Sequence, residues 1–361
     1  MSLSPHQQAP SGPTAVLLLG MGGPAEATEI GPYLQRLFAD PHLIELPFQP
    51  LLGPLIARTR RDRLRQRYAE IGGASPIARL TARQAQALSA RLAALRPEAD
   101  LHVEIAFRYA QPDVHTALRA LKARNVARVL VFLQYPHWAC ATSASALAQL
   151  GAALRAEPWS QPCEWGVIDR WGCDPGYISF LVQALRDHLS QSPPTPAPLL
   201  LFTAHALPMR QVARGQNYAQ EVAATVHEVM KALGFAFPYL LSYQSAIGPV
   251  AWLQPSTVDV IDGLGRHGQQ RVVVVPVGFT TDHLETLYDL DIVLAQRAQR
   301  AGLTHFHRLP APNDAPAFID AMAAMVLAHL DGSALPSMNL TLRCPGCQHE
   351  RCPADDFGFL S

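Results

Sequence analysis

Short apolar runs alternate along the chain with longer stretches in which apolar residues recur every three or four positions. The short runs predict strands, and the longer stretches predict amphipathic helices. Strands are expected at Thr14–Met21, His102–Tyr109, Ala127–Tyr135, Glu164–Trp171, Leu199–Leu207, Tyr239–Gln244, Arg271–Phe279 and Thr304–Leu309. Helical patterns lie between them, for example at Pro76–Leu95, Val114–Arg124, Tyr177–Leu189, Tyr218–Leu233 and His283–Ala301.

Strands that alternate with helices favour parallel sheets covered by helices on both faces. The predicted strands form two sets of four, so we expect an α/β protein with two similar βα domains that face one another across a cleft. Gly172, Pro175 and Gly176 interrupt the pattern and suggest the boundary. The expected parts are a flexible lead at residues 1–13, domains at 14–171 and 172–331, and a separate tail at 332–361.

The composition excludes some classes of protein. Hydrophobic residues make up 49% of the chain and charged residues 16%, which is typical of a globular protein and not of a disordered one. The 29 basic and 29 acidic residues balance, so no net charge favours nucleic acid as a partner. The first 13 residues show no export or organelle signal, and no apolar run is long enough to span a bilayer. A soluble, cytoplasmic protein is expected.

A group of acidic residues follows the apolar run Val272–Val277. Asp282, Glu285 and Asp289 are spaced i, i+3, i+7, so an α-helix would stack the three carboxylates on one face, with His283 beside them. Such a column at the carboxyl end of a buried strand could handle cations or protons. The alternative is a solvated helix face that begins with a Thr/Asp cap.

Polar and aromatic residues also end three other strands. His205 closes the strand Leu199–Leu207, and strand ends of this kind border the ligand crevice of open α/β sheets. Its imidazole can take protons or bind a metal, although a histidine buried in the core is the alternative. Arg108, Tyr109 and Tyr135 would suit a large, flat, anionic ligand; otherwise the arginine pairs with a carboxylate and the aromatics belong to the core.

Residues 46–63 combine apolar and basic side chains. Phe48, Leu51 and Leu55 precede the basic run Arg58–Arg63, which is the pattern of a shallow anchor on a membrane surface. A helix that packs on its own domain is the competing interpretation.

Three cysteines lie close together near the end of the chain, at Cys344, Cys347 and Cys352. Clustered thiolates bind zinc or iron–sulfur clusters. Three thiols are one short of a four-cysteine site, so a distant fourth ligand is required, and the spacing alone favours zinc.

Ordered motifs along the chain resemble those of the ferrochelatase family, the terminal enzymes of haem synthesis. The motifs are Leu18–Pro24 followed by Leu34–Phe38, Ile71–Pro76, Phe107–Tyr109, Gln134–Pro136, Ala204–Met209, Gly248–Leu253 and Phe279–Asp291. The resemblance implies two four-stranded Rossmann-like domains that clamp a porphyrin, and insertion of Fe²⁺ into protoporphyrin IX. A chelatase acting on coproporphyrin, and a non-catalytic porphyrin, iron or iron–sulfur protein, are the alternatives.

The resemblance also implies roles for single residues. His205 matches the essential active-site histidine, which accepts pyrrole protons or meets the metal; Glu285 matches its acidic partner, and Asp282, His283 and Asp289 match a relay. Val293 stands where the acidic ladder often continues, so the ladder is expected to end at Asp289. The residues expected to contact the porphyrin are Met21, Tyr68, Ser75, Arg108, Tyr109, Tyr135, Trp252 and Phe279.

The resemblance changes the interpretation of the cysteines as well. Cys140, Cys344, Cys347 and Cys352 match the four ligands of a [2Fe–2S] cluster found in some family members, so an iron–sulfur cluster replaces zinc as the expected cofactor. Protoporphyrin IX and ferrous iron are the implied partners. A peripheral contact with the inner face of the cell membrane is expected too, and a homodimer is compatible with the pattern.

Overall fold

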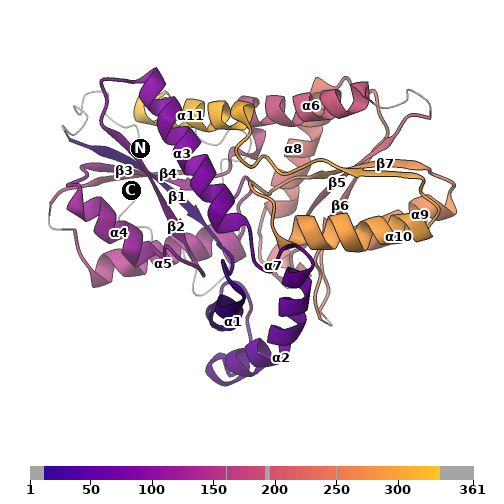
Figure 1. Ribbon diagram of the computed structural model, residues 1–361, viewed down its shortest axis with the longest axis horizontal. Coiled ribbons are helices and arrows are strands. Elements are labelled where there is room, and N and C mark those ends of the chain that lie inside the picture. The colour runs from indigo at the N-terminus through magenta and orange to yellow at the C-terminus, as the bar shows by residue number, and fades with distance from the viewer. Residues whose placement is uncertain (1–11, 160, 192–195, 249, 334–361) are drawn as a thin grey trace.

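Two sheets, each built of parallel strands, lie side by side in the computed structural model (Figure 1). The structure describes residues 12–159, 161–191, 196–248 and 250–333. The first sheet has the order β2-β1-β3-β4 and the second the order β6-β5-β7-β8. The strands are β1 Thr14–Gly20, β2 Leu101–Phe107, β3 Arg128–Leu133, β4 Glu164–Ile168, β5 Leu199–His205, β6 Tyr239–Gln244, β7 Arg271–Pro276 and β8 His305–Arg308. Every predicted strand is therefore present, and the two-sheet α/β fold is confirmed.

The central strands are apolar throughout because both faces of each sheet are covered. Residues 15–19 of β1 and 272–275 of β7 are almost completely buried. The parallel register aligns Gly20 of β1 with Phe107 of β2, and His205 of β5 with Gln244 of β6. The carboxyl ends of the strands therefore meet at one edge of each sheet, and the residues that follow them can form a common site.

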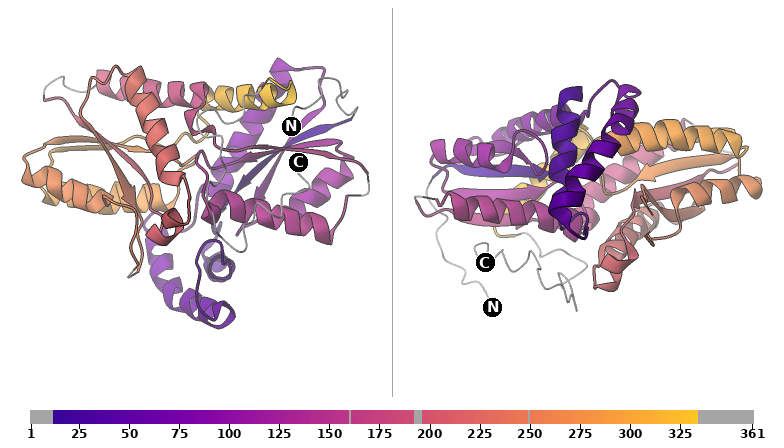
Figure 2. Two further views of the ribbon diagram at one scale, coloured as in Figure 1. Left: turned by 180° about the vertical axis from the view of Figure 1, so that it is seen from behind. Right: turned by 90° about the horizontal axis from the view of Figure 1, so that it is seen from below.

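Helices connect the strands and cover both sheets (Figures 1 and 2). The α-helices are α1 Ile30–Phe38, α2 Gln49–Ala69, α3 Ile77–Leu95, α4 Val114–Ala123, α5 Ser145–Ala156, α6 Pro175–Ser190, α7 Met209–Ala213, α8 Tyr218–Ala232, α9 Thr257–Arg266, α10 Ala295–Arg300 and α11 Pro316–Leu330. Short 3₁₀ segments lie at η1 Ala27–Glu29 and η3 Trp171–Cys173, and π-helical segments at η2 Cys140–Ala144 and η4 Glu285–Leu294.

The helix expected at His283–Ala301 differs from the prediction. Residues Glu285–Leu294 form the π-helical segment η4, and α-helical winding follows in α10, Ala295–Arg300. A π-helix closes i→i+5 hydrogen bonds, so residues four or five apart share a face, not residues three apart. Glu285 and Asp289 therefore point the same way, whereas Asp282 precedes the helix. The expected α-helical stack of three carboxylates is wrong.

Helix α11 follows the second sheet in sequence; it packs on α6 of the second half of the chain and also on α3 and β4 of the first half (Figure 1). Ion pairs fasten it there: Arg91 Nε lies 2.7 Å from Asp320 Oδ1, and Arg96 Nη2 lies 2.6 Å from Asp331 Oδ2. Phe318 and Met322 of α11 join one apolar cluster with side chains of both sheets. The boundary near residue 171 stays a prediction, since the last helix crosses it.

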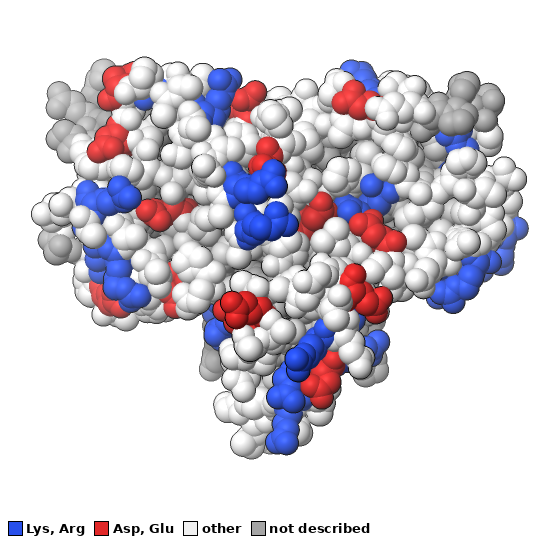
Figure 3. Space-filling model, viewed as in Figure 1, with Lys and Arg blue, Asp and Glu red and all other residues white. Residues whose placement is uncertain are grey.

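Helices α1 and α2 project from the body, and seen from below they lie across the junction of the two sheets (Figure 2). We call residues 30–69 the lip. Phe48, Leu51 and Leu55 are 79%, 74% and 57% exposed on it. A row of basic side chains runs along one edge of this projection, beside uncharged surface (Figure 3). Within the described residues, no helix is both long and apolar enough to pass through a bilayer.

Candidate active site

A cleft opens where the carboxyl ends of the two sheets face one another. Its walls come from the loops after β1, β3, β5 and β7 and from the start of η4. The residues that line it are Gly20, Met21, Gly22, Ile77, Thr81, Phe107, Gln134, Tyr135, His137, Thr142, His205, Tyr218, Gly278, Phe279, Thr280, Thr281, His283 and Glu285. The predicted residues Met21, Tyr135, His205, Phe279, His283 and Glu285 are thus brought together.

Two imidazoles flank the Glu285 carboxylate. His205 Nε2 lies 3.4 Å from Glu285 Oε1, and His283 Nε2 lies 3.7 Å from Glu285 Oε2. Each Nδ1 faces a backbone carbonyl, that of Ala206 at 2.7 Å and that of Thr281 at 3.0 Å. Because a carbonyl only accepts, both Nδ1 atoms carry hydrogen, and both Nε2 atoms are directed at the carboxylate.

The charges of this group are strongly coupled. Burial opposes the charged form of His205, but the Glu285 carboxylate outweighs it and raises the pKa of His205 to about 9. Burial likewise opposes ionisation of Glu285, yet His205 and His283 hold its pKa well below the ordinary value. At neutral pH the pair therefore holds a proton on His205 and a negative charge on Glu285. Oε2 of Glu285 has no hydrogen-bond partner among the described residues.

Backbone hydrogen bonds hold the segment after β5 and thereby fix the position of His205. The Ala206 amide donates to the Gln244 carbonyl at 2.8 Å, and the Leu253 amide donates to the Leu207 carbonyl at 2.9 Å. Trp252, a predicted porphyrin contact, forms an antiparallel β-bridge with Pro208 of the same segment. It is not among the residues that line the cleft.

Asp289, four residues beyond Glu285, is paired with the lip. Arg67 of α2 donates from Nη2 to Asp289 Oδ1, and its guanidinium carbon lies 4.6 Å from the centre of the Tyr288 ring. Ser245 adds a longer contact to Asp289 Oδ2 at 3.4 Å. Burial, only partly offset by Arg67, raises the pKa of Asp289. Nothing in the local sequence signals Arg67, because its partner is 222 residues away.

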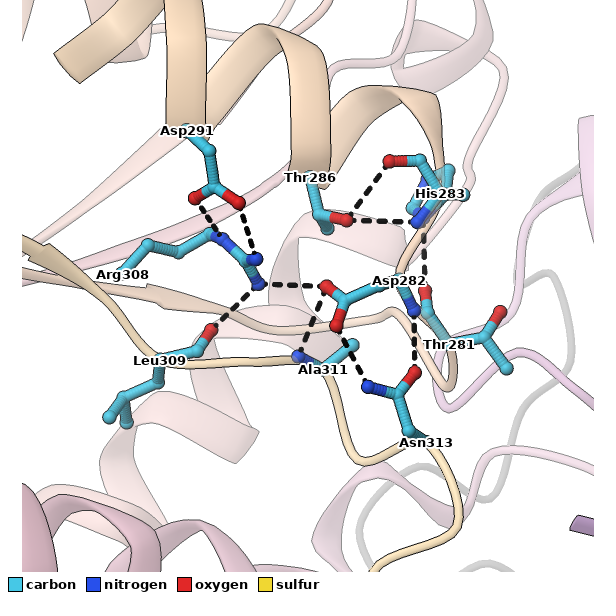
Figure 4. A network of polar contacts seen from close by, with 9 residues as sticks. All are labelled: Thr281, Asp282, His283, Thr286, Asp291, Arg308, Leu309, Ala311 and Asn313. Carbon is cyan, nitrogen blue, oxygen red and sulfur yellow. Dashed lines mark hydrogen bonds and ion pairs between the residues drawn. The ribbon is translucent and has the colours of Figure 1, made fainter. Parts of the chain in front are cut away.

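Asp282 turns away from the cleft into a buried network (Figure 4). Its Oδ1 accepts from Arg308 Nη1 at 2.8 Å, and its Oδ2 accepts from Asn313 Nδ2 at 2.8 Å. Arg308 also holds Asp291, with Nε 2.5 Å from Oδ1. These contacts give Asp282 a structural role, because they fix the turn between β7 and η4. Through that turn, Asp282 sets the start of the helix that carries Glu285.

Arg108 and Tyr109 lie in another buried network, centred on Asp40 of the lip. Arg108 Nη2 lies 3.2 Å from Asp40 Oδ2, to which Tyr109 also donates at 2.5 Å. Ser145 donates to the same oxygen. Burial alone would raise the pKa of Asp40, but Arg108 and these hydrogen bonds outweigh that effect and lower the pKa. The structure thus places Arg108 in the carboxylate pair that the sequence left as an alternative.

The remaining porphyrin contacts expected from the sequence divide between the wall of the cleft and the layer behind it. Met21 reaches the cleft because Gly22 follows it with φ +76°, where an added Cβ would lie 2.6 Å from that of Ala110. Tyr68 and Ser75 are buried just behind, 4% and 7% exposed, and are not lining residues.

The lining residues that were not predicted as site residues include Gln134, His137 and Tyr218. His137 Nε2 lies 2.8 Å from the Thr225 hydroxyl, whose single hydrogen goes to the Gly172 carbonyl at 2.9 Å. His137 therefore donates from Nε2 and keeps a bare Nδ1, which has no partner among the described residues. Burial lowers its pKa to about 3. Its place four residues after the end of β3, at the carboxyl edge of the first sheet, was the available signal.

Of the four predicted cluster ligands, only Cys140 lies within the described residues. It begins η2, is partly buried, and its backbone amide donates to Gln216 Oε1 at 3.1 Å. Cys344, Cys347 and Cys352 lie outside the described residues. No group of three or more metal-ligating side chains occurs in the described part of the chain.

Comparisons with known proteins agree with this geometry. The ferrochelatase family model matches residues 13–330. The chain is 38% identical to the mitochondrial ferrochelatase of Drosophila melanogaster, over 94% of this chain and 89% of that protein. It is 39% identical to that of Bos taurus, over 99% of this chain and 88% of that protein. Among solved structures, SirB from Bacillus subtilis with Fe³⁺ has a similar fold, with a TM-score of 0.51, 11% identity and coverage of 89% and 98%. The chain therefore belongs to the ferrochelatase family.

Proposed function

We propose that the protein inserts Fe²⁺ into protoporphyrin IX, the closing step of haem synthesis, and that the His205–Glu285–His283 group does the chemistry. The observation that carries this assignment is the carboxylate held between two Nε2 atoms in a cleft walled by Met21 and Phe279. The comparisons do not favour coproporphyrin chelation or a non-catalytic binding role.

Metal insertion must remove two N–H protons and strip water from a ferrous ion. At neutral pH His205 already holds a proton, because Glu285 stabilises it. A cation that approaches Oε2 of Glu285 weakens that stabilisation, so His205 releases its proton and gains a lone pair. His205 can then accept a proton from the porphyrin as a general base. Fe²⁺ binding and base activation would be one event.

His283 has the geometry of a second acceptor. Its Nε2 faces the other oxygen of Glu285, and its ring centre lies 4.8 Å from that of Phe279. Two pyrrole protons leave per turnover, and two imidazoles flank one carboxylate. Asp289 is the next acid along η4, where it would relay protons or guide the cation toward Glu285. Asp282 would serve by holding the loop rather than by exchanging protons.

The porphyrin itself would be held by Met21, Tyr135 and Phe279 on the cleft wall, with Tyr68, Ser75 and Trp252 supporting from behind. Arg108 and Tyr109 keep the expected role of contacting the porphyrin only if Asp40 gives up its contacts with them. We therefore propose that these two residues shape the site through Asp40. Bending the macrocycle to expose its nitrogen lone pairs would be driven by binding energy from these contacts.

The decisive experiment measures Fe²⁺ insertion by purified protein with protoporphyrin IX and coproporphyrin side by side. His205→Ala and Glu285→Gln should each lower kcat by at least about 100-fold, as expected for loss of a general base. His115→Ala is the matched control, because His115 lies in a surface pair with Glu157, half-exposed and outside the cleft. Near-normal turnover of His205→Ala would refute the assignment, and preference for coproporphyrin would refute the substrate.

A [2Fe–2S] cluster on Cys140, Cys344, Cys347 and Cys352 is our proposal for the cysteines. Four thiolates suit such a cluster chemically, and it would fasten the C-terminal tail to the start of η2. Iron analysis and a visible spectrum of the purified protein test its presence. Cys140→Ser should remove the visible bands; bands that persist in this variant would exclude Cys140 as a ligand.

Peripheral membrane contact through the lip is supported by the exposure of Phe48, Leu51 and Leu55 and by the row of basic side chains along one edge of the same projection (Figure 3). Flotation with anionic vesicles should be lost in the variant Phe48→Ser/Leu51→Ser, and equal flotation would refute the contact. The relatives are named as mitochondrial proteins, so they lend no support to the cytoplasmic location expected from the sequence. A homodimer stays a proposal, for which size determination in solution is the test.

A further inference from the structure

The lip touches both walls of the active site through ion pairs. On one side, Glu45 Oε1 accepts a hydrogen bond from Arg214 Nη1, and Glu45 Oε2 lies 3.7 Å from Arg210 Nη1. Both arginines come from the segment that follows His205. On the other side, Arg67 pairs with Asp289, on the same helix as Glu285. A segment from the first half of the chain is thereby fastened to the two elements that carry the reacting side chains.

The Arg67–Asp289 contact is built so that it can open. It uses one Nη2 atom and one carboxylate oxygen, and Arg67 Nε has no hydrogen-bond partner among the described residues. It lacks the two-point fork that makes arginine–carboxylate pairs strong. Both side chains are 26% exposed, so water can replace the contact. The guanidinium also lies over the Tyr288 ring.

Asp289 also acts electrostatically on the reacting group. It shares a face of η4 with Glu285, and its negative charge helps to raise the pKa of His205. Two carboxylates on one face attract a divalent cation, whereas a guanidinium on one of them cancels half of that attraction. The net negative charge of η4 that a cation meets therefore depends on whether Arg67 of the lip is paired with Asp289.

We propose that Arg67 is a positioning residue that masks Asp289 when its guanidinium lies on the carboxylate and unmasks it when the guanidinium swings into solvent. Asp289 is then free to capture a divalent cation at the rim of the cleft. Return of Arg67 to Asp289 drives the cation one turn inward, to Glu285. That the cation is ferrous iron rests on the proposed function; the coupling between Arg67 and a divalent cation does not.

Co²⁺ titration of porphyrin-free protein, followed by its visible spectrum and by calorimetry, tests the coupling. Arg67→Met should bind Co²⁺ about ten-fold more tightly than the unchanged protein, since a unit charge is removed next to the acid. Arg67→Lys keeps the charge and should stay within about two-fold. Arg63→Met, an exposed arginine of the same helix, is the matched control and should also leave the affinity unchanged.

The double variant Arg67→Met/Asp289→Asn should lose the whole gain, because the acid that was unmasked is gone. Equal Co²⁺ affinity of Arg67→Met and the unchanged protein would overturn the proposal, and so would a gain that persists in the double variant or that Arg63→Met reproduces. In insertion assays Arg67→Met should lower KM for Fe²⁺ and kcat together, while KM for the porphyrin stays constant. A protein that couples Arg67 to Co²⁺ but inserts no iron would refute the proposed function and leave this inference standing.

Discussion

Replacing Glu285 by glutamine should convert His205 from a charged to a neutral side chain. The substitution keeps the shape of the residue and removes the charge 3.4 Å from Nε2. With that charge present, the pKa of His205 is about 9, so about 97% of the imidazole is protonated at pH 7.5. Without it, burial dominates, and the pKa should fall to its ordinary value of about 6.5 or lower. The protonated fraction at pH 7.5 then drops to about 9% or less.

The assay is an NMR titration of the histidine ring carbons between pH 5 and 10, with the His205 signal assigned by its loss in His205→Asn. Glu285→Asp is the control, since it keeps the charge and should keep the midpoint above neutrality. A His205 midpoint that moves by less than half a unit in Glu285→Gln would contradict the coupling and with it the proposed link between metal binding and base activation.

The His205–Glu285 pair should also make the free energy of unfolding depend on pH, in a direction that follows from the raised pKa of His205. A raised folded-state pKa stabilises the folded protein fully below the unfolded value of about 6.5, and this contribution is lost as pH rises through about 9. The difference in unfolding free energy between the unchanged protein and Glu285→Gln should therefore shrink from pH 6.5 to pH 9.5. A constant difference over that range would show that His205 titrates alike in both proteins.

Three further predictions concern stability. His137 stays neutral when folded, so protonation of the unfolded chain should cost about 2–3 kcal/mol of stability between pH 7 and pH 4.5; urea unfolding of His137→Asn should show a flatter pH dependence, and parallel curves would exclude this. Asp282→Ala should cost about 3–5 kcal/mol because Arg308 is left buried with one carboxylate fewer, and a loss below about 1 kcal/mol would contradict the network. Arg91→Ala should cost less than about 1 kcal/mol, since its pair with Asp320 is exposed; a larger loss in thermal unfolding would mean that the pair is part of a cooperative network.

The strands could be predicted because burial on both faces of a parallel sheet makes them continuously apolar, as in β1 and β7. The position of His205 and Glu285 followed from the same rule, since residues just after parallel strands meet at one edge. Their family motifs added the roles, which a strand pattern alone does not carry.

The pairings within the site could not be predicted, because each joins residues far apart in sequence. Arg67 meets Asp289 over 222 residues, and Asp40 meets Ser145 over 105. The π-helical winding of η4 was invisible for another reason: the spacing of Asp282, Glu285 and Asp289 fits an α-helix equally well.

The crossing of α11 has a consequence for synthesis on the ribosome. The first sheet and α3 are complete by residue 168, but the apolar side chains that α11 covers stay uncovered until Leu330 has left the exit tunnel. The amino-terminal half must therefore wait, partly exposed, while about 160 further residues are made, which takes roughly 10–30 s at bacterial or eukaryotic rates. We therefore expect nascent chains, and a chain cut before α11, to bind chaperones that shield apolar surface.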